Sequence, residues 1–147
     1  MQVRQKRHHP SGRIYQLDER VTYLRVLWKS ICLNAYRHPW GTFCFSAIAL
    51  TQPLGLNPNS VARFLSVRRT RLKCCQDFRL EDQPRIWVEE SPTVESIVPI
   101  PLAVARAFWS YWSGRGLSKA TVLARGLETG ELVVHLNRAF FVRNLKG

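Results

Sequence analysis

An apolar stripe is the first regular feature of the chain after residue 13. Its members recur at steps of three and four residues: Val21, Leu24, Leu27 or Trp28, Ile31 and Ala35. This spacing is typical of an amphipathic helix. Asp18 and Glu19 would lie in the first turn, where the helix dipole favours negative charge. We expect this helix to end before residues 38–41, which include a proline and a glycine.

A second apolar segment and a turn follow. Residues 42–54 are mostly apolar, and alanines at positions 47 and 49 favour a helix over a strand. Residues 55–60 combine glycine, proline, asparagine and serine, which are typical of a turn. Asn59 or Ser60 would cap the next helix. That helix would begin near Val61 and continue to about Lys73, with or without a break near Val67.

The rest of the chain alternates between one short strand and helices. Arg85–Glu89 alternates and contains β-forming residues, which predicts a strand, and residues 93–100 are either its partner or a linker. We expect helices at residues 102–112 and from about 118 to 130. Residues 131–142 fit a helix or a hairpin, and we favour the helix. The helix at residues 102–112 carries three aromatic residues, Phe108, Trp109 and Trp112. We expect them in the core, and stacking on nucleic-acid bases is the alternative.

These elements predict a mainly α fold with a short β element, in which a helix-turn-helix precedes a helical C-terminal half. The expected organisation has four parts. They are a flexible basic arm at 1–13, a helical region at 14–80, an acidic strand or linker at 81–100 and the C-terminal half at 101–147. That last part would serve packing, homodimer formation or contact with a partner.

Charge gives the first indication of function. The 147 residues contain 22 Lys and Arg against 10 Asp and Glu, which gives a formal net charge of +12. A balance this basic indicates a polyanionic partner, such as DNA, RNA or an acidic membrane surface. The basic residues concentrate in residues 61–79, where six of them accompany one acid, whereas residues 80–95 are acidic.

The sequence offers little for catalysis, metal binding or export. Cys32, His38 and Cys44 lie six residues apart, but zinc sites usually contain a close Cys-x₂₋₄-Cys pair. No nucleophile, P-loop or dinucleotide motif occurs, so we expect no enzyme, no cofactor, no metal and no small-molecule substrate. No signal segment or spanning stretch is evident. We therefore expect a cytoplasmic protein, associated with the nucleoid if it binds DNA.

The turn at residue 55 has the spacing of a DNA-binding motif. Val61 and Phe64 follow Gly55 by six and nine residues, and Leu50 and Leu54 precede it on the first helix. Residues 45–70 thereby resemble the helix-turn-helix of phage-type and bacterial repressors. Two positions depart from that pattern: Thr51 replaces a small residue four before the glycine, and Pro53 lies late in the first helix. An ordinary helical hairpin is the alternative interpretation.

A second resemblance extends it to residues 45–143. The C-terminal half resembles a pattern in small, uncharacterised cyanobacterial proteins, some of which are similar to phage antirepressor domains. Leu117, Asn137 and Phe141 depart from this pattern, which would have Asn, Asp and Gly there. The likeness implies a shared fold more than a shared activity. The residues that carry it are Val104, Ala105, Phe108, Trp109, Tyr111, Gly116, Lys119, Ala120, Arg138, Ala139 and Phe140.

Together these patterns predict a non-catalytic DNA-binding protein, a regulator of transcription or of a phage or other mobile element. Side chains at the start of the second helix would read base edges, and the basic residues after it would contact phosphates. The alternatives are an RNA-associated basic protein and an antirepressor-like module that binds another protein. The candidate DNA-contacting residues are Asn57, Asn59, Ser60, Arg63, Arg68, Arg69, Arg71 and Lys73.

Overall fold

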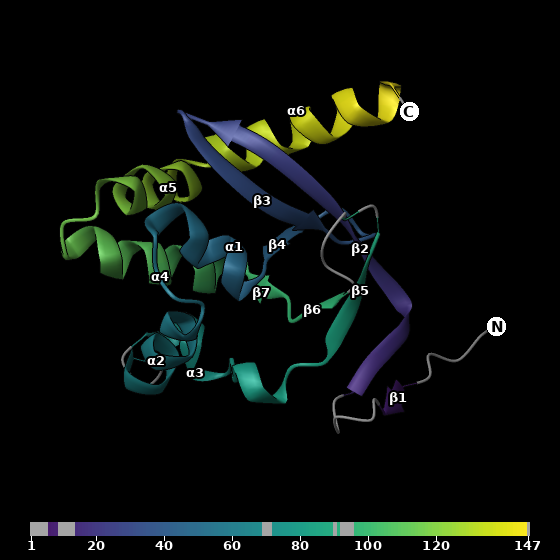
Figure 1. Cartoon of the computed structure of the whole chain (residues 1–147), viewed down its shortest axis with the longest axis horizontal. Coiled ribbons are helices and arrows are strands. Elements are labelled where there is room, and N and C mark those ends of the chain that lie inside the picture. The colour runs from purple at the N-terminus through teal and green to yellow at the C-terminus, as the bar shows by residue number, and fades with distance from the viewer. Residues whose placement is uncertain (1–5, 9–13, 69–71, 90, 92–95, 147) are drawn as a thin grey trace.

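A mixed β-sheet joined by helices forms the framework of the computed structural model, which describes residues 6–8, 14–68, 72–89, 91 and 96–146 (Figure 1). The spatial order of the strands is β6-β5-β2-β3-β4-β7, and β1 pairs with β2 outside this path. The strands are β1 Lys6–His8, β2 Ile14–Trp28, β3 Ile31–Arg37, β4 Phe43–Phe45, β5 Arg85–Glu89, β6 Ser96–Ile97 and β7 Ile100–Pro101. The helices are α1 Ala47–Thr51, η1 Gln52–Leu54, α2 Asn59–Arg68, α3 Lys73–Gln76, η2 Leu80–Asp82, α4 Leu102–Gly114, α5 Ser118–Thr129 and α6 Glu131–Lys146, where η denotes a 3₁₀-helix.

The expectation of a mainly α fold with a short β element is wrong, and the largest error is the helix expected after residue 18. Those residues form a β-hairpin, in which β2 and β3 pair antiparallel from Thr22–Arg37 to Trp28–Ile31. Residues 24, 26 and 28 are buried while 25 and 27 are exposed, which is the two-residue period of a strand. The turn uses Lys29 and Ser30, both with positive φ, which suits the twist of a two-residue hairpin.

The sheet also gathers segments that lie far apart in the chain. β5 pairs parallel with β2 and antiparallel with β6, while β7 pairs with β4. Segment 81–101 thereby joins the same sheet as the N-terminal hairpin. The strand expected at residues 85–89 is confirmed.

The predicted helical segment at residues 42–54 is only partly helical. Phe43–Phe45 forms β4, and α1 begins after Ser46, whose side-chain oxygen accepts a hydrogen bond from the Ala49 amide. Two bulky aromatic residues favour a strand at this point. The serine cap then fixes where the helix begins.

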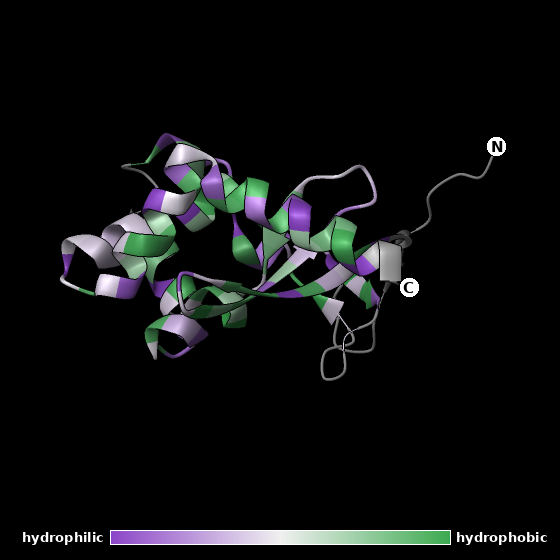
Figure 2. Cartoon of the chain, turned by 90° about the horizontal axis from the view of Figure 1, so that it is seen from above, coloured by the Kyte–Doolittle hydropathy of each residue, from purple (hydrophilic) through white to green (hydrophobic). Residues whose placement is uncertain are grey.

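The helices of the C-terminal half agree with the sequence. α4, α5 and α6 occupy the expected positions, so the preference for a helix after residue 130 is confirmed. Figure 2 shows hydrophobic and hydrophilic residues alternating along the helices, as amphipathic packing requires. Among the described residues, no helix combines the length and apolar character needed to cross a membrane.

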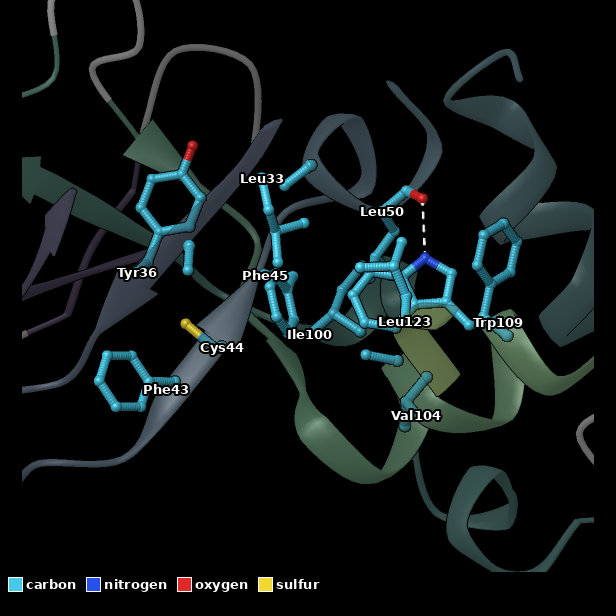
Figure 3. Close-up of a cluster of buried hydrophobic side chains, with 14 of the residues drawn as sticks. Leu33, Tyr36, Phe43, Cys44, Phe45, Leu50, Ile100, Val104, Trp109 and Leu123 are labelled. Atoms are coloured by element: carbon cyan, nitrogen blue, oxygen red, sulfur yellow. Dashed lines mark hydrogen bonds between the residues drawn. The ribbon is translucent and has the colours of Figure 1, made fainter. Parts of the chain in front are cut away.

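The core lies between the sheet and α4 and α5. Phe108 and Trp109 are completely buried, which confirms their expected place in the core, and Trp112 is half-buried. Trp109 meets Phe45 of β4 edge-on, with ring centroids 5.1 Å apart (Figure 3). Leu123 of α5 is buried in the same cluster.

α6 runs beside the β2–β3 hairpin in both views (Figures 1 and 2). His135 packs on the Trp28 ring with centroids 5.2 Å apart, and the guanidinium of Arg37 lies 4.2 Å from the centre of the Phe140 ring. The guanidinium of Arg143 donates a hydrogen bond to the Tyr23 carbonyl. These contacts hold the last helix against the hairpin.

Candidate nucleic-acid interface

Residues 47–68 form two helices joined by a tight turn. α1 and η1 continue into each other over residues 47–54, and α2 begins at Asn59. Gly55 ends the first helical segment with φ of 69°, a left-handed conformation that favours glycine. This conformation begins the turn that the sequence predicts at residues 55–60.

Three of the four apolar residues that set the spacing of the motif are buried, and the fourth, Leu54, is partly buried. Leu50 and Val61 have no exposed surface, and Phe64 is 5% exposed. The departures from the repressor pattern are accommodated locally. The hydroxyl of buried Thr51 donates to the Ala47 carbonyl at 2.8 Å, and Pro53 lies in the first turn of η1, where a missing N–H costs little.

α4 holds both helices in place. The indole N–H of Trp109 donates to the Leu50 carbonyl of α1 at 3.0 Å (Figure 3). On α2, the Phe64 ring packs against Phe108 and Tyr111, with centroids 5.6 and 5.4 Å away. The inner sides of α1 and α2 are thus occupied, and α2 lies at the edge of the molecule (Figure 1).

The start of α2 carries the residues predicted to read DNA. Asn57, Asn59 and Arg63 are exposed, and Ser60 is half-buried. The cap differs from the expectation, because Asn59 is already the first helical residue. Instead, the side-chain oxygen of Asn57 accepts a hydrogen bond from the Asn59 amide at 2.9 Å. This bond leaves the Asn59 side chain outside the cap and fixes the direction in which the chain enters α2.

The basic run after α2 is divided. α2 ends at Arg68, so the helix does not continue to Lys73, which begins the separate short helix α3 and is exposed. Arg69 and Arg71 lie outside the described residues, and of Arg68 the structure describes the backbone.

Two cations outside the set predicted from the sequence lie on α4 or directly after it. A groove of about 620 Å³ runs between α4 and the helices α2 and α3, and Arg106 lines it together with Phe64 and Tyr111. The guanidinium of Arg115 lies 4.9 Å from the centre of the Tyr111 ring. Both arginines are exposed. Since α4 begins 34 residues after α2 ends, local spacing could not associate either arginine with α2.

Among the described residues, the positive charges of this surface are not neutralised by ion pairs. There, no ion pair involves Arg63, Lys73, Arg106 or Arg115. The charges of the four side chains are therefore available to an anion, and such contacts neutralise phosphates on nucleic acid.

Two of the four cysteine thiols, those of Cys44 and Cys75, are buried. Burial raises the pKa of Cys44 to about 12 and that of Cys75 to about 12, which keeps both thiols protonated near neutral pH. The sulfur atoms of Cys74 and Cys75 lie 3.7 Å apart. In the described part of the chain, no group of three or more His, Cys, Asp or Glu residues could hold a metal ion.

The geometry of this surface suits a DNA groove. An exposed helix start with amide and guanidinium side chains can enter the major groove, which is about 12 Å wide, and meet base edges there.

Comparisons with protein-family models, with curated proteins and with solved structures give no match to the chain.

Proposed function

We propose that the protein is a non-catalytic DNA-binding regulator in which α2 is the recognition helix. The observation that carries this proposal is the pair of helices at residues 47–54 and 59–68 around left-handed Gly55. Leu50, Val61 and Phe64 are buried at the motif's spacing, so the opposite side of α2 is free to face a partner.

The exposed side chains would have two roles in binding: some would contact the DNA bases, and others would contact the phosphate backbone. Asn59 and Arg63 would contact base edges, because amide and guanidinium groups can make paired hydrogen bonds to adenine and guanine. Lys73, Arg106 and Arg115 would contact phosphates on either side of the helix. The net charge of +12 supports a polyanionic partner for the whole chain.

Fluorescence anisotropy with labelled duplex DNA at several salt concentrations tests the proposal. We expect affinity to fall steeply with salt, and Arg63→Gln to weaken binding by about tenfold, a typical value for one bidentate base contact. Arg138→Gln is the matched control. It makes the same change on exposed α6, which Figure 1 places on the opposite side of the molecule from α2. Equal effects of the two variants, or no duplex binding at low salt, would refute the proposal.

Further substitutions separate base reading from phosphate contact. Joint replacement of Arg68 and Arg69 should weaken binding to every sequence and reduce the salt slope by about one per lost phosphate contact. Replacement of Asn59 by Ala should instead change which sequences bind best. A structured RNA that displaces the DNA probe more readily than duplex DNA would favour the RNA-associated alternative. A stable complex with a repressor, without nucleic-acid affinity, would favour the antirepressor alternative.

A further inference from the structure

A cleft of about 970 Å³ lies between the sheet and the helices α1, η1 and α2. β2 and β3 contribute Tyr23 and Asn34 to one wall, and α1 and η1 contribute Ile48 and Gln52 to another. Ser66 of α2 also lines the cleft. Ligand sites in proteins have volumes of roughly 300–1,000 Å³, so this cleft can hold an organic molecule.

The polar groups of the cleft include three side-chain amides from separate elements. Asn34, Gln52 and Gln83 lie on β3, on η1 and just before β5. An amide side chain presents one acceptor and two donors close together, which matches the paired donors and acceptors on the edge of a nucleobase. Asn34 is positioned for this role, because its oxygen accepts a hydrogen bond from the Tyr23 hydroxyl at 2.9 Å, which turns its NH₂ group away from that bond.

The remaining lining favours a flat and partly apolar ligand. Tyr23 supplies an aromatic ring, and bases stack on such rings. Ile48 lines the cleft and is 53% exposed, so part of its apolar surface is open to a ligand. A planar ring inserted here would cover this apolar surface.

The charges of the cleft disfavour an anionic ligand. Arg85 lines it, but its guanidinium already donates to the Ser96 side chain at 2.9 Å and to the Ser96 carbonyl at 2.7 Å. Glu81 brings a carboxylate to the same cleft. One cation and one anion leave no net charge, in contrast to the basic surface around α2.

From these groups we infer that the cleft is a binding site for an uncharged nucleobase or nucleoside. The amides of Asn34, Gln52 and Gln83 recognise the edge of the base, and the Tyr23 ring and Ile48 contact its faces. This site is separate from the proposed DNA surface, because it is lined by Ala62 and Ser66 of α2 and does not include Asn59 or Arg63.

Isothermal titration of the full chain with adenosine, guanosine, cytidine and thymidine, each in turn, tests the assignment. At least one nucleoside should bind saturably at one site. Ser66→Trp places a large side chain on the wall of the cleft and should weaken this binding at least about tenfold. Val67→Trp is the matched control, because Val67 lies on the same helix, is 64% exposed and does not line the cleft. Its nucleoside affinity should stay within about twofold of the parent protein.

A second variant tests the hydrogen-bonding groups of the cleft rather than its volume. Gln83→Leu keeps the size of the side chain but removes its donors and acceptor, so it should weaken the nucleoside about tenfold, as the loss of one buried hydrogen bond does. Circular dichroism confirms that each variant is folded. Three results would overturn the inference: no nucleoside binds, Ser66→Trp and Val67→Trp act alike, or a nucleoside monophosphate binds more tightly than its nucleoside. None of them depends on DNA binding, so either proposal can fail alone.

Discussion

The substitution Trp109→Phe tests how α1 is attached to the rest of the protein. Trp109 is completely buried on α4, and its indole N–H donates to the Leu50 carbonyl of α1. Phenylalanine keeps an aromatic ring beside Phe45 but has no N–H. The change therefore removes one hydrogen bond between the helices and leaves a small cavity.

The expected cost is the sum of two effects. A buried carbonyl that loses its partner costs about 1–3 kcal/mol. The smaller ring leaves a volume of roughly 40 Å³, which at about 24 cal/mol per Å³ adds about 1 kcal/mol. The free energy of unfolding should therefore fall by about 2–4 kcal/mol, a large share of the roughly 5–15 kcal/mol that is typical of globular proteins.

Urea denaturation followed by far-ultraviolet circular dichroism measures this change. Trp40→Phe is the control, because its indole N–H also donates a hydrogen bond, to the Thr42 hydroxyl at 2.8 Å, but the residue is 56% exposed. Water can replace that bond, so the control should lose less than about 1 kcal/mol. If both variants lost the same stability, the role assigned to the buried bond would be wrong.

Three further predictions concern packing, pH and ligand linkage. Gly126→Ala would place a Cβ atom 3.0 Å from the indole nitrogen of Trp28 and 3.1 Å from Leu132 Cβ, and should cost about 1–3 kcal/mol in thermal or urea unfolding. Gly114→Ala, where the Cβ would meet nothing within 4 Å, should leave stability unchanged or slightly raised. Since burial raises the pKa of Cys44 from 9.0 to about 12, the folded state holds this proton more tightly. Stability should fall as pH rises from 9 towards 12, by at most about 1.4 kcal/mol per pH unit for this thiol, and urea titrations of Cys44→Ala should show a shallower fall. A saturating nucleoside should change the DNA dissociation constant, measured by anisotropy, by about fivefold or more.

The hairpin shows where sequence patterns were insufficient. Val21, Leu24, Trp28 and Ile31 fit the steps of three and four residues of a helix. Leu24, Trp28 and Ile31 also fit a hairpin, in which residues 24, 26 and 28 face the core and Ile31 pairs with Trp28. The exposed fraction of Leu27, 62%, separates the two patterns, and it follows from pairing with β3 rather than from local sequence. The parallel pairing of β2 with β5 joins residues more than 60 positions apart, which no local period can reveal.

Local signals were more successful in the candidate site. The turn at Gly55 depends on one left-handed residue and on apolar residues at fixed offsets, and all of these lie within about 15 residues of one another. Arg106 was missed because tertiary packing of α4 brings it to the groove lined by Phe64 of α2, and Arg115 was missed because only the fold places it over the Tyr111 ring. The cleft was missed for the same reason, since its amides come from β3, from η1 and from Gln83, two residues before β5.

If both proposed sites bind their ligands, α2 connects them physically, because it contributes residues to each. Asn59 and Arg63 are exposed on the side of α2 that we propose to face DNA, whereas Ala62 and Ser66 line the cleft. The cleft also includes Tyr36 and Ser46, and Ser46 caps α1, so a ligand there would contact both helices of the motif and the sheet that supports them. If the ligand and DNA each prefer one arrangement of these elements, binding of the ligand changes the affinity for DNA. By thermodynamic linkage, DNA must then change the affinity for the ligand by the same factor.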